Sequence, residues 1–162
     1  MQKRKALDSH YTLIHTSHFP YTAFGKKKKK ALLGIGGNIG DTLRRFEHLF
    51  WYFKRSRYIH IVESAPIIKN PPFGYIKQEN FYNTLLLIET RLTPKMLLRY
   101  LLKTERRFRR KRSFKNAPRT LDIDILFYEK RVIDTKNLIL PHPEWMKRLC
   151  VLIPLAHMKN HI

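Results

Sequence analysis

The sequence has almost no cysteine, since Cys150 is the single thiol among its 162 residues. One cysteine cannot form a disulfide within the chain, and a chain without disulfides suits a reducing compartment. No stretch approaches the ~18 apolar residues of a membrane span, and no continuous apolar segment follows the basic N-terminus, as it would in a secretory signal. We therefore expect a cytoplasmic protein that does not enter a membrane.

Acidic residues are also scarce. The chain holds 12 Asp and Glu against 33 Lys and Arg, which gives a formal net charge of +21 at pH 7. This excess predicts a polyanionic partner, which is nucleic acid, a nucleoside triphosphate or anionic lipid. Charge alone does not choose among them. The length favours one domain with a sizeable hydrophobic core.

Residues 1–30 lack a clear hydrophobic period and end in five consecutive lysines, Lys26 to Lys30. Like charges packed this closely repel one another and oppose compact order. The pattern predicts a basic, disordered arm over residues 1–30, followed by a folded domain over residues 31–162. A contact between the lysine run and nucleic acid is the alternative interpretation of this segment.

Apolar residues are periodic from Ala31 onward. The pattern predicts, in order, a strand at 31–36, a helix capped by Asp41, strands at 58–64 and 82–90, a helix starting at Thr93-Pro94, a strand at 121–127 and a short strand at 138–140. This β-α-β-β-α-β order is that of a ferredoxin-like α+β sandwich with an antiparallel sheet, here with added C-terminal elements.

Two acids stand out in this basic chain. Asp122 and Asp124 alternate with Leu121, Ile123, Ile125 and Phe127, which is the period of a half-buried strand. Both carboxylates therefore lie on one face of the strand, while the aliphatic residues face a core. Two carboxylates side by side predict a site for one or more divalent cations.

A basic stretch leads into this strand, with nine Lys or Arg between Lys103 and Arg119. Guanidinium groups beside paired carboxylates suit a metal-bound polyphosphate, because the metal bridges carboxylate and phosphate oxygens and the arginines donate forked hydrogen bonds. The alternative is a network of ion pairs within the protein, although two acids cannot neutralise so many bases.

Other segments are more ambiguous. The glycine-rich turn at 34–40 lacks the Gly-Lys-Ser/Thr of a phosphate loop and has Ile39 where a dinucleotide fingerprint needs glycine, so a tight strand-to-helix turn is favoured. Phe81 and Asn83 offer a ring and an amide on one face, or a core residue beside a turn residue. His142 faces a phosphate or lies on the surface.

Together these segments resemble the 6-hydroxymethyl-7,8-dihydropterin pyrophosphokinase family along residues 31 to about 157. The resemblance rests mainly on Arg110-x-Arg112 followed by Ala117-Pro118-Arg119-Thr120-Leu121-Asp122-Ile123-Asp124-Ile125-Leu126. It is supported by the turn at 36–41, the loop at 70–74, Phe81-Tyr82-Asn83, Pro141-His142 and Arg148. Cys150 stands near the position where the family usually places a second aromatic ring.

The resemblance implies a ferredoxin-like fold and transfer of pyrophosphate from ATP to the hydroxymethyl group of the pterin, with release of AMP, in folate biosynthesis. It implies a monomer whose two Mg²⁺ ions are held by Asp122 and Asp124, with charge stabilised by Arg110 and Arg119. The implied ATP-binding residues are Glu105, Arg110, Arg112, Ile125, His142 and Arg148. The implied pterin-binding residues are Asn70, Pro71, Pro72, Phe73, Phe81, Asn83 and Cys150.

Two functions of another class remain as alternatives. An RNA-binding module on a ferredoxin-like sheet should carry an aromatic-rich Lys/Arg-Gly-Phe/Tyr pattern, which this sequence lacks. A basic structural protein of a ribonucleoprotein would use the Lys26–Lys30 run as its anchor. Neither explains two acids on the face of a central strand.

Overall fold

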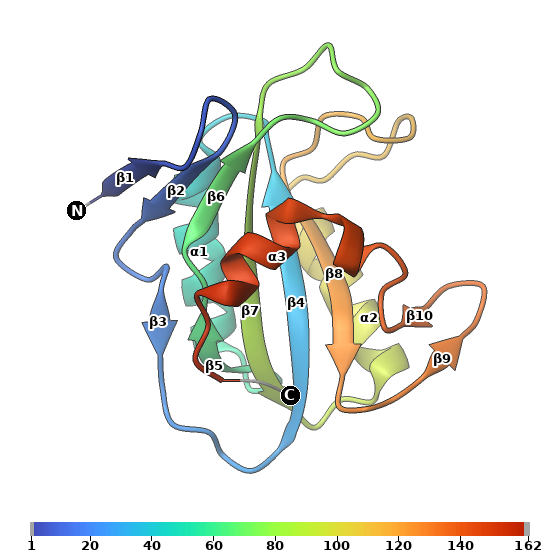
Figure 1. Cartoon of the computed structure of the whole chain (residues 1–162). Coiled ribbons are helices and arrows are strands. Elements are labelled where there is room, and N and C mark those ends of the chain that lie inside the picture. Colours follow the sequence, from blue (N-terminus) through green and yellow to red (C-terminus); the bar gives the residue numbers. More distant parts are fainter. Residues whose placement is uncertain (1, 161–162) are drawn as a thin grey trace.

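The computed structural model describes residues 2–160, in which helices cover both faces of an eight-stranded antiparallel sheet (Figure 1). The strands of this sheet are β1 (Lys3–Ala6), β2 (Thr12–His15), β3 (Tyr21–Thr22), β4 (Lys29–Gly37), β5 (His60–Ser64), β6 (Ile67–Asn70), β7 (Phe81–Thr90) and β8 (Asp122–Tyr128). A separate hairpin pairs β9 (Ile133–Asp134) with β10 (Ile139–Leu140). The helices are α1 (Thr42–Arg55), α2 (Pro94–Arg107) and α3 (Leu149–Ala156), with a 3₁₀ turn, η1, at Trp145–Lys147.

Both long helices begin where the sequence predicts. The Asp41 carboxylate accepts a hydrogen bond from the Arg44 N–H at the start of α1, and the Thr93 hydroxyl accepts one from the Met96 N–H at the start of α2. Each cap satisfies an N–H that the helix itself cannot pair. None of the helices in residues 2–160 is long and apolar enough to cross a membrane.

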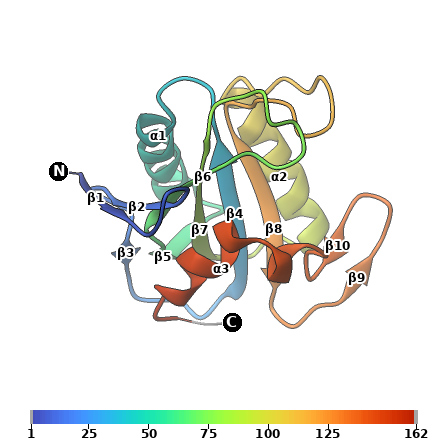
Figure 2. The same cartoon turned by 45° about the horizontal axis from the view of Figure 1, so that its top comes forward.

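The sheet places the two longest strands at its centre. Its order is β1-β2-β6-β7-β4-β8, with β5 also paired to β7 and β3 paired to β5. Helices α1 and α2 lie against one face of the sheet, and α3 lies against the other (Figure 2). Because β8 pairs only with β4, one edge of β8 is left free for other contacts.

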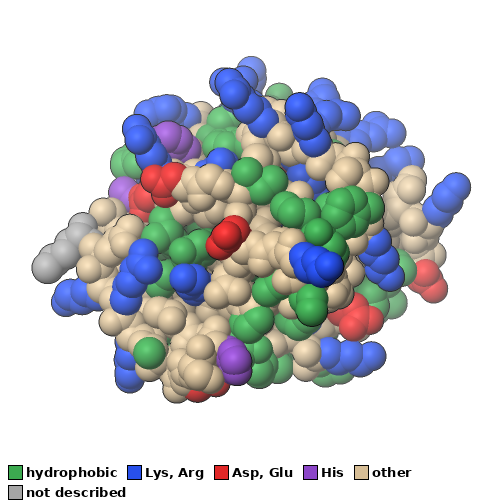
Figure 3. Space-filling view, turned by 90° about the horizontal axis from the view of Figure 1, so that it is seen from above, with side chains coloured by type: hydrophobic (Ala, Val, Ile, Leu, Met, Phe, Trp, Pro, Cys, Tyr) green, Lys and Arg blue, Asp and Glu red, His purple; other side chains and the backbone are tan. Residues whose placement is uncertain are grey.

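The outer surfaces of α1 and α2 are strongly basic. The two helices carry nine Lys and Arg against two acids, Glu47 and Glu105. Viewed from above, lysine and arginine side chains gather along the upper margin of the molecule, the side that α1 and α2 cover (Figure 3). These two helices supply a net charge of +7 out of the formal +21, so this side of the molecule carries part of the charge excess.

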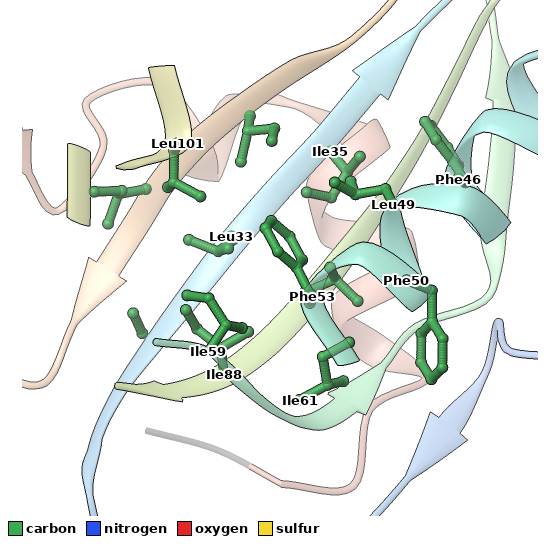
Figure 4. Close-up of a cluster of buried hydrophobic side chains, with 14 of the residues drawn as sticks. Leu33, Ile35, Phe46, Leu49, Phe50, Phe53, Ile59, Ile61, Ile88 and Leu101 are labelled. Carbon is green, nitrogen blue, oxygen red and sulfur yellow. The ribbon is translucent and has the colours of Figure 1, made fainter. Parts of the chain in front are cut away.

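The main core fills the space between the sheet and these two helices. Phe46, Leu49 and Phe53 of α1 extend toward Leu33 and Ile35 of β4 (Figure 4). All five side chains are at most 2% exposed, and each such burial stabilises the fold by roughly 1.5–3 kcal/mol. This packing fixes β4, and through their pairing also β8, as a rigid base for the opposite face.

The N-terminal segment differs from the predicted disordered arm. Strand β2 extends the main sheet by pairing with β6, and Leu13, Ile14 and Phe19 are at most 3% exposed. The Phe19 ring packs 6.2 Å from that of Phe46. Strands of four residues or fewer are too short for their period to be recognised, and their partners lie far along the chain. Residue 1 and residues 161–162, at the ends of the two predicted ranges, lie outside the described residues.

Two smaller differences concern strands. The sequence predicts no strand between the strands at 58–64 and 82–90, and it places residues 70–74 in a loop, whereas Ile67–Asn70 form β6, which pairs with both β2 and β7. The predicted strand at 138–140 forms only the short β10, which belongs to the separate hairpin. The α+β class and the antiparallel sheet are confirmed.

Candidate active site

The two aspartates lie on β8 as the alternation predicts. Ile123 and Ile125 are each 4% exposed in the main core, whereas Asp122 and Asp124 are half-buried on the opposite face. Both carboxylates line a small cavity on the α3 side, and both also line a larger cavity that extends toward α2. The aspartate pair therefore marks the junction of two cavities.

The smaller cavity has a volume of about 80 Å³ and combines aromatic, amide and charged groups. Besides the aspartates, seven residues that the resemblance implies line it: Phe73, Phe81, Asn83, Arg119, His142, Arg148 and Cys150. Asn116 and Trp145 complete this part of the wall. Ring faces beside an amide suit a flat, polar heterocycle.

The larger cavity has a volume of about 940 Å³. Glu105 and Arg112 line it together with the aspartates, and apolar side chains of α2 and the β9–β10 hairpin, such as Leu98, Leu102 and Leu138, line the remainder. A charged end beside an apolar wall suits a ligand with a phosphate chain at one end and a ring system at the other.

Two arginines converge on Asp122. Nη1 of Arg110 donates to the Leu121 carbonyl and to Oδ1 of Asp122, both at 2.9 Å, and Nη1 of Arg119 donates to Oδ2 at 3.3 Å. The buried Nε of Arg110 has no partner among the described atoms. The predicted ion-pair network is thus present, but it leaves guanidinium donors free for a further anion.

Asp124 is the less compensated acid. Its carboxylate forms no ion pair or side-chain hydrogen bond with any other residue in the range 2–160. Burial, together with the negative charges of Asp122 and Glu105, raises the pKa of Asp124 to about 7. A divalent cation beside the two aspartates would relieve this repulsion, so the donor set fits Mg²⁺.

The protein alone supplies few metal ligands. Within residues 2–160, no group of three or more His, Cys, Asp and Glu side chains is arranged to hold a metal ion. A cation at Asp122 and Asp124 would therefore take its other ligands from water and from a bound molecule. This is the usual arrangement for Mg²⁺, which keeps several waters and is often held by carboxylates plus substrate phosphates.

Glu105 connects α2 to the free edge of β8. It is 2% exposed, accepts a 2.8 Å hydrogen bond from the Ile123 N–H and pairs with Nη2 of Arg112 at 2.9 Å. Burial raises the pKa of Glu105, while the Ile123 N–H and the nearby arginines act in the opposite direction. Arg112 itself remains 62% exposed, so its guanidinium is held at the cavity by one end only.

A buried residue behind the small cavity positions one of the residues that line it. Nδ2 of Asn83 donates to Oδ1 of Asn70 at 2.7 Å, and Asn70 is only 1% exposed. Asn70 thus orients Asn83 from behind. Neither Asn70 nor Pro71 nor Pro72 is among the described residues that line the two cavities.

Cations cover both aromatic rings of this cavity. The guanidinium carbon of Arg119 lies 4.8 Å from the centre of the Phe81 ring, and that of Arg148 lies 5.9 Å from the centre of the Phe73 ring. Burial and the Arg148 charge lower the pKa of His142, and burial raises the pKa of the Cys150 thiol to about 11. Cys150 is therefore a neutral, packed thiol at physiological pH.

Two implied ATP-binding residues, Arg110 and Ile125, are not among the described residues that line either cavity. Arg110 contacts the site through Asp122, whereas the Ile125 side chain lies in the main core at 4% exposure. The Ile123 N–H points away from β4 toward Glu105. Backbone groups two residues apart in a strand point the same way, so those of Ile125 also point to the outer edge of β8.

The sequence did not single out Asn38, which links three loops. It is 6% exposed, its Oδ1 accepts from the Arg119 N–H, and its Nδ2 donates to Gln78 and to the Glu79 carbonyl, each at 2.9 Å. Arg119 is thereby held by its backbone as well as by Asp122. The partners lie up to 81 positions apart, so no local pattern indicates this contact.

Comparison with known proteins identifies close relatives. A family model described as 7,8-dihydro-6-hydroxymethylpterin-pyrophosphokinase matches residues 32–160. The 2-amino-4-hydroxy-6-hydroxymethyldihydropteridine pyrophosphokinase of Helicobacter pylori is 43% identical over 148 residues, which cover 88% of this chain and 91% of that protein. Proteins of the same name from Campylobacter jejuni and Bacillus subtilis are 40% and 34% identical, over 80% and 82% of this chain and 82% and 79% of their own length.

The match to the Helicobacter pylori protein also reaches into the N-terminal segment, because 88% of 162 residues exceeds the 132 residues that follow Lys30.

Proposed function

The chain belongs to the 7,8-dihydro-6-hydroxymethylpterin-pyrophosphokinase family, and we propose that the junction of its two cavities is the place where the pyrophosphoryl group is transferred. The protein is a pyrophosphokinase, a transferase that moves this group to hydroxymethyldihydropterin in folate biosynthesis. One observation carries the assignment of the site: Asp122 and Asp124 are shared by both cavities.

In this proposal the small cavity receives the pterin and the large cavity receives ATP. The reacting hydroxymethyl oxygen and the phosphate chain then meet at the aspartates. The oxygen bonds to the β-phosphorus, the bond between the α- and β-phosphates breaks, and AMP leaves. Such a transfer depends mainly on positioning and on stabilisation of negative charge, which suits a site rich in guanidinium groups.

Mg²⁺ is the cation that we assign to Asp122 and Asp124, since their oxygens fit it. Two such ions would neutralise phosphate charge and make the hydroxymethyl group easier to deprotonate. The role of the two carboxylates is to fix the polyphosphate on the β8 face. Asp124, which lacks a partner in residues 2–160, is the more available of the two.

Arg110 and Arg119 stabilise the charge that develops on the transferred group. Both are already directed at this point through Asp122, and the unpaired Nε of Arg110 provides a further donor. Arg112, held by Glu105, reaches the phosphates from the large cavity, and Arg148 and His142 reach them from the small one. Charge-assisted hydrogen bonds of this kind contribute about 1.5–3 kcal/mol each.

The adenine ring is recognised by the backbone of Ile125, whose N–H and C=O face the free edge of β8. The Ile125 side chain stays in the core and keeps the strand in place. The ATP-binding role that the resemblance implies for Ile125 thus belongs to its main chain.

The pterin stacks on Phe81 and hydrogen-bonds to Asn83, with Phe73 and Cys150 at its margin. Asn70 acts by orienting Asn83, and Pro71 and Pro72 stiffen the loop that carries Phe73. The cavity of about 80 Å³ is well below the ~300–1,000 Å³ of most ligand sites. Binding therefore requires that side chains such as Arg119 and Arg148 move aside from the two rings.

Three further proposals concern the fold, the extent of the catalytic domain and the oligomeric state. The β4-α1-β5-β7-α2-β8 core is proposed to be a ferredoxin-like sandwich, because its strand order β5-β7-β4-β8 agrees with the order expected for that fold. Residues 31–162 are proposed to be the catalytic domain, since the lining residues of both cavities come from this range. The protein is proposed to act as a monomer, because one chain supplies both cavities.

The test is an assay of AMP formation with the purified protein, Mg²⁺, ATP and 6-hydroxymethyl-7,8-dihydropterin. We expect AMP to form only when all three are present. Asp124→Asn should reduce turnover by at least about 100-fold, as removal of a major electrostatic contact commonly does, without unfolding the protein. Normal turnover of this variant at ordinary Mg²⁺ concentration would exclude Asp124 as a metal ligand.

A further inference from the structure

A second concave surface lies outside the candidate active site, and the sheet separates it from the small cavity. This basic groove follows the outer side of α1 and α2 and has a volume of about 620 Å³. The side chains that matter here are Tyr52, Arg55, Arg57, Tyr58, Tyr100 and Arg107. None of them lines either cavity that meets at the aspartates.

The groove continues toward the lysine run. A neighbouring hollow of about 340 Å³ shares Ser56, Arg57 and Tyr58 with the groove, and Lys26, Lys28 and Lys54 line its other side. The lysines that the catalytic site leaves unexplained thus lie at one end of a continuous surface, and Arg107 lies at the other.

The cations of this surface are not neutralised by the protein. Within residues 2–160, none of its lysines or arginines lies within ion-pair distance of a carboxylate, because the four ion pairs all involve other residues. Glu89 is the single acid in the linings of the groove and hollow, and it is 1% exposed and accepts the Lys26 N–H. A polyanion would meet six uncompensated Lys and Arg here.

Aromatic rings alternate with these charges. Tyr58 is 45% exposed and lies 5.6 Å from the Tyr100 ring. The guanidinium carbons of Arg57 and Arg107 lie 5.7 Å and 5.4 Å from the ring centres of Tyr58 and Tyr52. Rings for stacking beside cations for phosphates are the combination that binds single-stranded nucleic acid, whereas a site for phosphate alone needs no rings.

We infer that this groove binds single-stranded RNA, with the arginines and lysines on phosphates and Tyr58 stacked on a base. The function is additional to catalysis and uses residues that line neither of the two cavities that meet at the aspartates. Side chains at the ends of α1 and α2 and in the loops at 26–28 and 56–58 supply the site, so it does not require the aromatic sheet pattern of an RNA-recognition module.

The main experiment measures binding of a fluorescein-labelled single-stranded RNA of about 12 nucleotides by fluorescence anisotropy. Mg²⁺ and ATP are present and the pterin is absent, so that the catalytic cavity is occupied. The test variant is Arg55→Gln/Arg57→Gln/Arg107→Gln, and the matched control is Lys3→Gln/Arg4→Gln/Lys5→Gln on exposed β1. Both triple variants remove the same charge.

We expect the groove variant to weaken RNA binding at least tenfold, and the β1 variant to change it less than twofold. The slope of log K against log salt should decrease by about 2 in the groove variant, since each single-strand phosphate contact contributes roughly 0.7. AMP formation and the melting temperature should remain normal in both. Equal loss of binding in the two variants would overturn the inference, because net charge would then be responsible.

A second variant tests the stacking contact. Tyr58→Ala should weaken RNA binding by about fivefold or more, the usual effect of losing one base–aromatic contact, while binding of inorganic polyphosphate of equal length stays constant. If Tyr58→Ala leaves RNA binding unchanged, the groove does not recognise bases and the inference is wrong. It is equally overturned if vesicles of anionic lipid, and not RNA, lose affinity for the groove variant.

Discussion

The Asn83 side chain occupies the space that a β-carbon on Gly36 would need. A Cβ at Gly36 would lie 2.5 Å from Oδ1 of Asn83, whereas a Cβ at Gly34 on the same strand would lie 3.5 Å from its nearest neighbour, in Leu126. Contacts below 3.0 Å force a shift, and the Asn83 amide is the group that must move. Glycine at this position therefore allows Asn83, which we assign to pterin binding, to keep its orientation.

Gly36→Ala should raise KM for the pterin about 5- to 10-fold, the equivalent of losing one hydrogen bond of ~1–1.5 kcal/mol. KM for ATP should change little, because the large cavity lies on the other side of the aspartates. Steady-state kinetics with each substrate varied in turn measures this difference. An unchanged KM for the pterin in Gly36→Ala would contradict the role of Asn83.

Asp124 makes the stability of the metal-free protein dependent on pH. Its folded pKa of about 7 lies above the ordinary value of 3.8 because of burial and the neighbouring acids. The folded state therefore holds this proton more tightly than the unfolded state, and the protein loses stability as pH rises between these two values.

Asp124→Asn removes this penalty. At pH 8 with a chelator present, the free energy of unfolding should rise by about 1–3 kcal/mol, since one pKa unit corresponds to about 1.4 kcal/mol and the half-buried carboxylate is partly screened. Near pH 4 the two proteins should be about equally stable. Urea unfolding at both pH values measures the difference, and a variant less stable than the native protein at pH 8 would contradict the electrostatic argument.

At the scale of the elements, the sequence predicted the long and periodic parts. Leu43, Phe46, Phe50 and Phe53 of α1 recur at helical spacing and are all buried, and the caps at Asp41 and Thr93 act as expected. The strand β8 alternates from Asp122 to Ile125, which fixes the faces of the two aspartates without knowledge of their surroundings, but beyond Ile125 the alternation breaks and Phe127 packs on the α3 side instead of in the main core. Local patterns suffice for such elements because the period itself identifies the buried side.

The short strands and the connections between loops could not be predicted in this way. β2 and β6 have four residues each and are stabilised by pairing across more than fifty positions. Asn38 and Arg119 meet because β4 and β8 are neighbours, and neither residue signals the other. The large cavity likewise depends on the β9–β10 hairpin lying near α2, which no period in the sequence encodes.

Phe19 tests whether the N-terminal strands are part of the fold. It is fully buried against Phe46 and Phe50, whereas Phe24, five residues on, is 95% exposed. Phe19→Ala should lower the free energy of unfolding by about 3–5 kcal/mol, the cost of emptying a buried aromatic site.

Phe24→Ala is the matched control and should change the stability by less than about 0.5 kcal/mol. Denaturant unfolding of both variants gives the comparison. If the two substitutions have equally small effects, residues 1–24 are not packed on the core and the predicted arm is correct.

At the scale of the whole molecule, the sheet separates two charged surfaces. The α3 face carries the small cavity of the proposed active site, the large cavity extends from the aspartates to α2, and the outer side of α1 and α2 carries the basic groove. The N-terminal segment contributes to the second surface through Lys26 and Lys28 and extends the edges of the sheet through β1–β3. It contributes no side chain to either catalytic cavity.

Removal of residues 1–28 should therefore lower the stability and weaken RNA binding, while catalysis stays nearly unchanged. The shortened protein keeps β4 complete but loses the buried Leu13, Ile14 and Phe19, which should cost several kcal/mol at roughly 2–5 kcal/mol for each large side chain. The kcat for AMP formation is measured at a temperature where circular dichroism shows that the shortened protein is folded. It should stay within about twofold of normal, which corresponds to a change of about 0.4 kcal/mol in the activation free energy. A large loss of kcat under those conditions would mean that the catalytic domain begins before residue 31.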